Sequence, residues 1–553
     1  MQEILTGMKL RLWLILLGLG IIPLLTSAQS FPKQDTLRGT ITSERSWWDL
    51  TFYHLKVNVN PNDSTISGTN EMTYRVLTPS NLLQIDLQEP MNITQVTQDG
   101  LPLIFNREGN VYWISLTKYQ QPRDYNKLII TFSGRPKVAK RPPWDGGISW
   151  SKTAQGKPFI ASSCQGLGAS VWWPCKDHMY DEPDSMNISV TCARDLTSVA
   201  NGRLENKVIN ADGTRTFNWR VSNPINNYSV NINIAPYAHY RDTFQGEKGV
   251  LDIDYYPLPE NLNKARTQFT EVKRMLKAFE YWFGPYPFYA DGYKLVEVPY
   301  LGMEHQSSIT YGNGYQNGYL GTDLSGTGWG LKFDFIIVHE SGHEWFANSI
   351  TYRDMADMWI HESFTNYSEN LFLEYYFGKE AGAAYVIGTR KNIRNDKPII
   401  GPYGVNKSGS GDMYYKGGNM LHTLRQWVGN DIKWRELLRS LNSAFYHQTV
   451  DSKQIEDFIS QQTNLILRGF FDQYLRDTRI PKFVYRINGN KVEFKWAETN
   501  AAFNLPVNIS TDEGKSWMIV EPLTDKWMRI KAKKGVNQLI MDDDYYVQVE
   551  KLN

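Results

Sequence analysis

Hydrophobic and polar residues alternate with a period of two along the first part of the chain, from about residue 35 to residue 240. Such alternation is typical of strands that bury one face. Asp212-Gly213 predicts a hairpin turn between two of these runs. The pattern therefore predicts an all-β N-terminal domain over residues 29–245. The clearest runs are Leu55, Val57 and Val59, and Val230, Ile232 and Ile234, whose polar neighbours are expected to face solvent.

The period becomes helical near residue 260. Apolar residues recur at steps of three and four from Leu262 to Phe283, which predicts one helix ending at Gly284-Pro285. The region up to residue 480 is predicted to be mostly helical, and it forms the second domain, residues 246–480. Alternation returns after Pro481 on both sides of Asn488-Gly489, which predicts a small C-terminal β-sandwich over residues 481–553. The expected fold class is multidomain α+β.

A metal motif lies in the helical region. His339 and His343 are four residues apart, so one helix face presents both imidazoles to one metal ion, and Glu362 follows after eighteen intervening residues. Two histidines and one carboxylate leave a fourth position open for water, as in catalytic zinc sites. Glu340 would then lie beside that water as general base. The alternative, a solvated helix face, is disfavoured because apolar residues flank the motif and its charges must be satisfied inside the protein.

Composition excludes some classes of function. The formal net charge is +1 and no block of like charge occurs, so we expect no nucleic-acid partner. Residues 1–28 are typical of a signal peptide, with Lys9 and Arg11 before the apolar run Leu12 to Leu25. The run is shorter than the ~20 apolar residues of a spanning helix, so cleavage is favoured over a stable membrane anchor. We expect an exported protein, periplasmic or secreted. The three cysteines allow at most one disulfide within the chain.

The segment from His339 to Asn348, together with Asp357 to Phe364, resembles the zinc signature of the M1 family of metallo-aminopeptidases, which are gluzincins related to aminopeptidase N and leukotriene A4 hydrolase. The similarity extends over roughly residues 50–480. The resemblance implies a thermolysin-like catalytic domain and one Zn²⁺ per chain. Further matching stretches are Gly284 to Phe288, Leu301 to His305, Tyr414 to Gly417, and Pro174-Cys175 with Asp181 to Pro183.

The stretch Leu301 to His305 resembles the family's exopeptidase motif, which implies that Gly302, Met303 and Glu304 bind substrate. A carboxylate at Glu304 would hold the free α-ammonium of a peptide. By the same resemblance Gln165 is a second amine-binding residue. This stretch departs from the family's exopeptidase motif at two positions. Leu301 replaces the first glycine of the motif, and His305 replaces its final asparagine.

Tyr414 is the expected electrophile, because its spacing to Lys416-Gly417 is similar to that in the family. A phenol O–H aimed at the scissile carbonyl oxygen would stabilise the charge that develops there. Tyr415 is the alternative candidate for this role. A third departure places His361 before Glu362. Since His339, His343 and Glu362 complete the ligand set, His305 and His361 are interpreted as pocket or supporting residues.

The sequence thus predicts an exported zinc aminopeptidase whose partners are peptides with a free N-terminus. Two alternatives stay open at this point: a zinc endopeptidase that uses the same ligands without an ammonium-binding carboxylate, and a catalytically silent surface protein that binds a partner through its β-domains. The sequence does not predict the side-chain preference, the accepted peptide length, any epoxide hydrolase activity or the oligomeric state.

Overall fold

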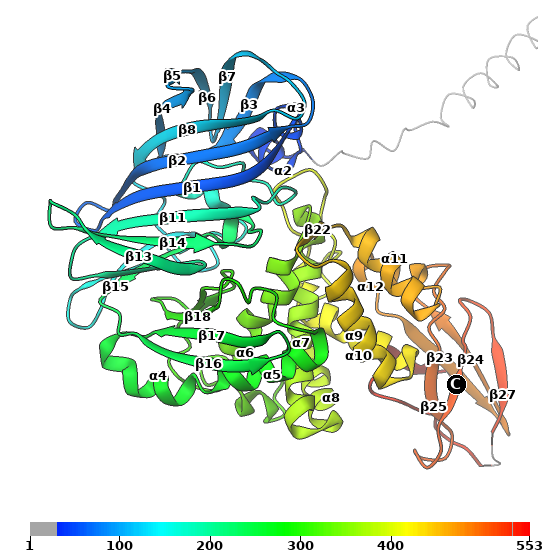
Figure 1. The fold of residues 1–553 in the computed structure, drawn as a ribbon. Helices are drawn as coiled ribbons and strands as arrows, with labels where there is room; N and C mark the ends of the chain where they lie inside the picture. Colours follow the sequence, from blue (N-terminus) through cyan, green and yellow to red (C-terminus); the bar gives the residue numbers. More distant parts are fainter. Residues whose placement is uncertain (1–29, 533–534, 553) are drawn as a thin grey trace, which may run out of the picture. The chain divides into compact units, whose positions relative to one another are not determined.

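The computed structural model describes residues 30–532 and 535–552 of the chain, and the described residues from Gln34 onward form one compact unit. The predicted signal peptide, residues 1–28, lies outside the described residues. Two short helices, α2 (Lys33–Gly39) and α3 (Ser43–Ser46), precede the first strand. The structure is of mixed α+β class, as predicted, with a β-rich N-terminal part, a helical catalytic part and a C-terminal β region (Figure 1).

The N-terminal part is built around an eight-stranded sheet in the order β13-β14-β11-β1-β2-β8-β4-β5 (Figure 1). Strand β1 (Trp48–Asn60) lies near its centre, antiparallel to β2 and parallel to β11. Leu55, Val57 and Val59 are all buried in its core, which confirms the alternation there. The other strands are β2 (Thr65–Val76), β4 (Asn92–Gln98), β5 (Leu101–Pro102), β8 (Tyr125–Gly134), β11 (Ser185–Cys192), β13 (Arg203–Ile209) and β14 (Arg215–Val221).

Two smaller sheets complete this part. One has the order β12-β15-β10-β9 and the other β3-β7-β6. Asp212-Gly213 lies in the turn between β13 and β14, as predicted, and Gly213 has a φ of 82°. Bounds of the remaining strands are β3 (Ser80–Asp86), β6 (Ile104–Glu108), β7 (Val111–Gln120), β9 (Gly147–Lys152), β10 (Pro158–Ser163), β12 (Thr197–Ala200) and β15 (Ile232–Ala235).

The predicted solvent face of residues 229–234 is wrong. Ser229, Asn231 and Asn233 are as deeply buried as their apolar neighbours. The reason is that this segment packs against the catalytic part, where Asn231 Nδ2 donates to the carbonyl oxygen of Ser308 (3.2 Å). Asn233 Nδ2 likewise donates to the Val199 carbonyl oxygen (3.4 Å), and Ser229 Oγ donates to Asn348 Oδ1 (2.7 Å), so these polar side chains bond groups inside the protein.

A five-stranded sheet, β16-β17-β18-β20-β19, opens the catalytic part. The short strand β19 (Gly302–Met303) forms one edge of this sheet, antiparallel to β20. Helices pack around it, and the central ones, α6 and α7, carry the metal motif. The other strands are β16 (Tyr240–Gly246), β17 (Gly249–Tyr256), β18 (Tyr293–Glu297) and β20 (Ile309–Tyr311), and a two-stranded ladder joins β21 (Ile350–Tyr352) to β22 (Gln448–Val450).

The single helix predicted over residues 262–283 is instead two helices, α4 (Leu262–Gln268) and α5 (Glu271–Phe283). The Thr270 hydroxyl donates to the Thr267 carbonyl oxygen (2.7 Å), which offers the backbone a partner other than the next helical amide. Helix α5 ends at Gly284, as predicted. The remaining helices are α6 (Phe335–Gly342), α7 (Trp359–Phe377), α8 (Lys379–Gly388), α9 (Tyr415–Val428), α10 (Asp431–Ala444), α11 (Ser452–Thr463) and α12 (Arg468–Leu475).

The C-terminal β region contains two small sheets, β27-β24-β23-β29 and β26-β25-β28. Asn488-Gly489 lies at the hairpin between β23 and β24, where Phe483 pairs with Trp496 and Tyr485 with Phe494. These aromatic residues are buried, which confirms the predicted alternation. Strand bounds are β23 (Lys482–Asn488), β24 (Lys491–Ala497), β25 (Val507–Ser510), β26 (Met518–Val520), β27 (Met528–Lys531), β28 (Ile540–Met541) and β29 (Gln548–Lys551).

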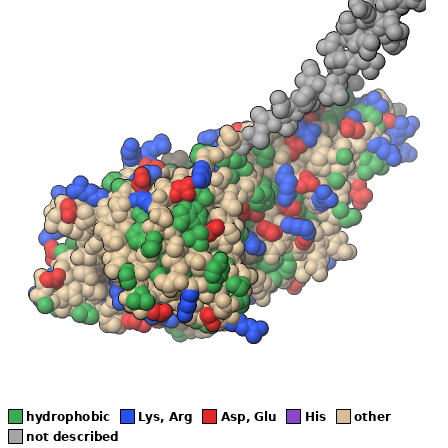
Figure 2. Space-filling model, turned by 90° about the horizontal axis from the view of Figure 1, so that it is seen from above, with side chains coloured by type: hydrophobic (Ala, Val, Ile, Leu, Met, Phe, Trp, Pro, Cys, Tyr) green, Lys and Arg blue, Asp and Glu red, His purple; other side chains and the backbone are tan. Residues whose placement is uncertain are grey.

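Cys164, Cys175 and Cys192 are buried free thiols, so the disulfide that the count allows is absent among them. Within the described ranges, no helix has both the length and the apolar character needed to cross a membrane. Acidic and basic side chains are interspersed over the face of the molecule shown in Figure 2. That mixture agrees with the near-neutral net charge.

Candidate metal centre and active site

The metal motif begins on a buried helix. Asp334 caps α6, because its carboxylate accepts the backbone N–H of Ile337 (3.3 Å). His339 lies in the last turn of this helix. The chain then leaves the α-helical path, and Phe346 takes φ −121° and ψ 73°. This turn releases the Phe346 carbonyl oxygen from helical bonding, so that it becomes available to His343.

Each histidine donates its Nδ1–H to a fixed acceptor. His339 Nδ1 lies 2.8 Å from Glu369 Oε1, and His343 Nδ1 lies 3.1 Å from the Phe346 carbonyl oxygen. Thr365 Oγ1 is also 3.1 Å from His343 Nδ1. Because a carboxylate and a carbonyl can only accept, both Nδ1 atoms carry the proton and both Nε2 atoms keep a lone pair. Partners of this kind orient the histidines of metal sites and raise their basicity.

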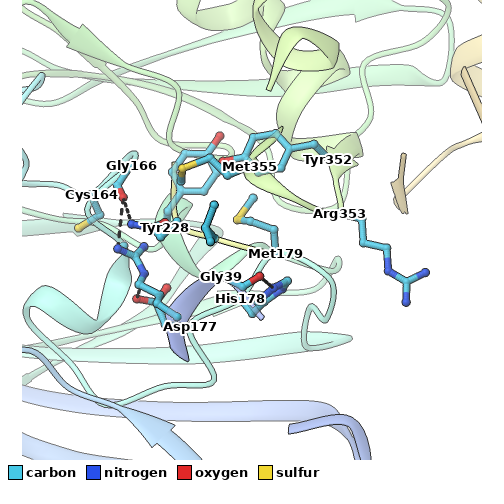
Figure 3. Close-up of a pocket in the computed structure, with 14 residues that line it drawn as sticks. Gly39, Cys164, Gly166, Asp177, His178, Met179, Tyr228, Tyr352, Arg353 and Met355 are labelled. Carbon is cyan, nitrogen blue, oxygen red and sulfur yellow. Dashed lines mark hydrogen bonds and ion pairs between the residues drawn. The ribbon is translucent and has the colours of Figure 1, made fainter. Parts of the chain in front are cut away.

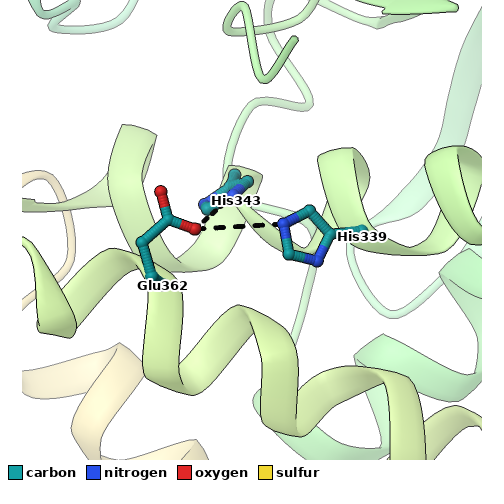
Figure 4. A group of neighbouring side chains, drawn as sticks. All are labelled: His339, His343 and Glu362. Atoms are coloured by element: carbon teal, nitrogen blue, oxygen red, sulfur yellow. Dashed lines mark ion pairs between the residues drawn. The ribbon is translucent and has the colours of Figure 1, made fainter. Parts of the chain in front are cut away.

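Glu362, in the first turn of α7, faces these two lone pairs (Figure 4). Its Oε2 lies 3.5 Å from His343 Nε2 and 3.9 Å from His339 Nε2. Ligands about 2.1 Å from a tetrahedral zinc ion are about 3.4 Å apart, so the three atoms are spaced to hold one ion. The Glu362 Oε2 atom is also buried without a hydrogen-bond partner. The three predicted ligands therefore come together and fit zinc.

Glu340 faces the same space from the next position on α6. It is buried, and it forms a second group of close ligand atoms with Glu304 and His343. Burial, and after it repulsion from Glu304 and Glu362, raises the pKa of Glu340 well above its usual range. Gly302 makes room for it, because a Cβ there would lie 2.6 Å from Ile336 Cγ2 and 3.2 Å from Glu340 Oε1. The backbone of β19 thus runs directly beside the glutamate.

Glu304 is buried beside the metal motif, with an exposed fraction of 2%. Two side chains donate to its Oε1, namely Gln165 Nε2 (2.5 Å) and Tyr228 OH (3.1 Å). Gln165 Nε2 also donates to Glu362 Oε1 (3.1 Å). The predicted pair Glu304 and Gln165 is therefore brought together and linked to a metal-ligand candidate.

The loop that carries Gln165 is held from behind. Arg38 Nη1 donates to the Gly166 carbonyl oxygen (3.2 Å), and its Nε lies 3.4 Å from an Asp177 carboxylate oxygen. Arg38 and Asp177 line a small cavity of about 40 Å³ together with Tyr228 and Tyr352 (Figure 3). Asn406 Nδ2 donates to the same carbonyl (3.2 Å) from the helical part. Groups from both parts of the chain thus set the position of Gln165.

Tyr414 precedes α9 and lies at the metal motif. Its side chain lines the same cavity as Glu362, and its ring centroid is 6.1 Å from that of His339. Burial, followed by the nearby carboxylates Glu362 and Glu304, raises the pKa of Tyr414 well above its usual range. The phenol therefore keeps its proton and can donate it in a hydrogen bond.

These groups line one cavity of about 430 Å³. The metal-ligand candidates, Glu340, Glu304, Gln165, Gly302, Met303, Tyr414 and Tyr415 all contribute to its wall. The remaining lining is mostly apolar and comes from both the N-terminal and the helical part; it comprises Pro143, Trp144, Gly166, Leu301, Tyr319, Phe335, Ile336, Met358, Asn366 and Ser408.

His305 and His361 lie outside this lining. His361 Nε2 accepts the backbone N–H of Tyr352 (2.8 Å), so it is engaged in structure. His305 is fully buried, and burial lowers its pKa to about 3. Neither belongs to the groups of described side chains that could hold a metal ion.

Three supporting residues were not anticipated from the sequence: Glu369, Thr365 and Tyr228. Glu369 and Thr365 follow Glu362 on α7 at seven and three positions, so helical spacing could have placed them on the same face. Tyr228 had no such signal. It lies 76 positions before Glu304, and only the fold brings them together.

Two family models match the N-terminal and catalytic parts of the chain. The family model of the peptidase M1 N-terminal domain matches residues 50–229, and that of the peptidase family M1 domain matches residues 267–474. Among curated proteins, tricorn protease-interacting factor F2 of Thermoplasma volcanium is 20% identical over 426 residues, covering 74% of this chain and 50% of its own length. Leucine aminopeptidase 2 of Vanderwaltozyma polyspora is 23% identical, covering 63% and 54%. The chain thus spans about half the length of these relatives.

Solved structures are similar in fold. An M1 zinc metallopeptidase from Deinococcus radiodurans superposes with a TM-score of 0.68 at 20% identity, covering 81% of this chain and 98% of that one. A mutant of that enzyme, solved with a Tyr-Ser-Ala substrate, gives a TM-score of 0.67 at 20% identity, covering 81% and 99%. At this level of identity the likeness establishes the shared fold.

Proposed function

The chain belongs to the M1 family of peptidases, and we propose that it is a zinc-dependent aminopeptidase that removes the N-terminal residue from peptides. The observation that carries the proposal is the charge of the cavity. Glu304, Glu340 and Glu362 are all buried and converge on it. Buried carboxylates need compensating positive charge. A zinc ion and one α-ammonium group together supply three positive charges, which balances the three carboxylates.

His339, His343 and Glu362 would hold the ion. Bound zinc supplies a Lewis acid that polarises a carbonyl oxygen and lowers the pKa of water to about 7. Glu340 lies within the same group of close atoms as His343 and takes the proton of the attacking water at its carboxylate. It then returns that proton to the departing amine. One residue thus serves as base and acid in turn.

Glu304 sets the direction of attack. Its carboxylate accepts from the substrate's α-ammonium in charge-assisted hydrogen bonds, while Gln165 and Tyr228 hold it in place. Because Gln165 Nε2 points to two carboxylates, its amide oxygen remains as a second acceptor for the ammonium. Tyr414 donates to the oxygen of the scissile carbonyl as charge develops there. The β19 backbone at Gly302 and Met303 lies beside Glu340, where a peptide can extend the sheet edge.

The experiment is a panel of aminoacyl fluorogenic substrates and short peptides, each with a free or an acetylated N-terminus. The wild-type protein is compared with Glu340→Gln and Glu304→Gln, and zinc is measured on each sample. We expect about one zinc per chain and turnover only of substrates with a free N-terminus. Both variants should lose this turnover. Undiminished cleavage of acetylated peptides would favour an endopeptidase. Absence of zinc and of turnover would favour a silent binding protein.

We also propose that the protein is exported and that its signal peptide is removed after Ala28. The support is the charged start, the apolar run and the small residues Thr26, Ser27 and Ala28. Mass spectrometry of the protein made with its full N-terminus tests this, and a mature chain that retains residues 1–28 would contradict it.

A further inference from the structure

Trp144 exposes 68% of its surface, the largest fraction for any tryptophan in the described part of the chain. Trp517, in the C-terminal β region, follows with 48%. Unlike Trp517, Trp144 lines the cavity that holds the metal motif. A large aromatic side chain that is exposed and also lines a cavity offers apolar surface to a ligand that enters it.

The loop that presents Trp144 is fixed by its own hydrogen bonds. Asp145 Oδ2 accepts the backbone N–H groups of Lys140 (2.8 Å) and Arg141 (2.9 Å). Gly146 N donates to the Pro143 carbonyl oxygen (3.2 Å), which closes a tight turn around Trp144. The indole is therefore offered from an ordered support, which lowers the entropic cost of binding.

This loop lies at the amine-binding end of the cavity. It leads into β9, where Gly147 pairs with Ser163 of β10, two positions before Gln165. Close packing confirms the proximity, because a Cβ at Gly146 would lie 2.8 Å from Leu167 Cβ. Trp144 therefore stands near the residues that hold the substrate's ammonium group, and the side chain of the first substrate residue is the part that it can reach.

We propose that Trp144 forms the outer wall of the subsite for the side chain of the first substrate residue, and that this subsite selects large apolar side chains, aromatic ones above all. The inference rests on the proposed aminopeptidase function. Leu301 and Met303 supply apolar surface to the same cavity, and a thioether also packs favourably against aromatic rings. An acidic first residue would meet Glu304 and Glu340 instead.

The test compares wild type, Trp144→Ala, Trp144→Phe and Trp517→Ala on otherwise identical substrates beginning with Phe, Leu or Ala. In Trp144→Ala we expect kcat/KM to fall about tenfold for Phe and to change less than about twofold for Ala. Trp144→Phe should restore most of the loss, and the control Trp517→Ala should match wild type. Equal losses on all three substrates, or none, would overturn the inference while leaving the proposed function intact.

A binding measurement separates the two claims further. Affinities of the tripeptides Phe-Ala-Ala and Ala-Ala-Ala are measured by calorimetry on zinc-loaded Glu340→Gln with and without Trp144→Ala. We expect Phe-Ala-Ala to bind more tightly only when Trp144 is present. If wild type cleaves no substrate, the proposed function fails; if the affinity difference survives the loss of Trp144, the subsite assignment fails.

Discussion

The metal-binding end and the amine-binding end of the cavity are built in different ways. His339, His343 and Glu362 come from two consecutive helices, α6 and α7, and lie within 24 residues. Gln165 and Tyr228 reach Glu304 across 139 and 76 positions of the chain. Helical spacing pairs the two histidines, and packing of the neighbouring helix α7 against α6 adds Glu362, whereas the second end exists only when the N-terminal and catalytic parts pack together.

Their supports differ in the same way. Helix α7 provides Glu362 and also Thr365 and Glu369, which hold the two histidines. Glu304 is held through Tyr228 and through its own carbonyl oxygen, which accepts from Asn348 Nδ2 (2.8 Å). We therefore expect changes at the first end to alter metal content, and changes at the second to alter substrate binding at unchanged metal content.

Glu340 lies between the two ends, and its loss should have the largest effect. Glu340→Gln keeps the shape of the side chain but removes the base, so kcat should fall by ~10²–10⁴. Zinc content and KM should stay near wild type. Steady-state kinetics with metal analysis checks this, and full zinc-dependent turnover in the variant would show that another group is the base.

Tyr414→Phe should lower kcat by ~10²–10³, because one donor to the developing oxyanion is lost. The matched control is Tyr415→Phe, which removes the hydroxyl of the neighbouring tyrosine that lines the same cavity. The control should keep most of its turnover. A larger loss in Tyr415→Phe would assign the electrophile to that residue.

Glu369→Ala should weaken zinc binding by about 10- to 100-fold, because His339 loses the acceptor that orients it. Competition with a chelator measures the zinc affinity, and excess zinc should restore much of the turnover. Glu374→Ala, on the same helix but paired with Arg425, is the control for a general loss of helix stability. Equal weakening in both variants would contradict a specific role of Glu369.

Tyr228→Phe should have the smallest effect of the series. It removes one hydrogen bond to Glu304 and leaves the ring in place, so KM should rise about two- to tenfold at unchanged zinc content. Kinetics on a free-N-terminus substrate checks the rise. A loss of zinc in this variant would break the distinction between the two ends.

Several features were predictable because they depend on nearby residues. The hairpins at Asp212-Gly213 and Asn488-Gly489 follow from turn chemistry, and the alternation around them follows from one buried face. The break of the helix at Thr270 was not predicted, because apolar spacing continues through it, whereas the structure shows a side-chain hydrogen bond from Thr270 to the Thr267 carbonyl oxygen there. Hydrophobic periodicity gives no information about such a bond.

The metal-ligand candidates could be identified without a structure, because helical geometry turns a spacing of four residues into a shared face. The sequence also pointed to Glu304 and Gln165 through their resemblance to family motifs. Three features became visible only in the folded chain: Tyr228 supports Glu304, residues 229–234 are buried on both faces, and Trp144 lines the cavity. These contacts join segments far apart in the chain. They depend on how whole sheets and helices pack, and a pattern of neighbouring residues carries no information about that packing.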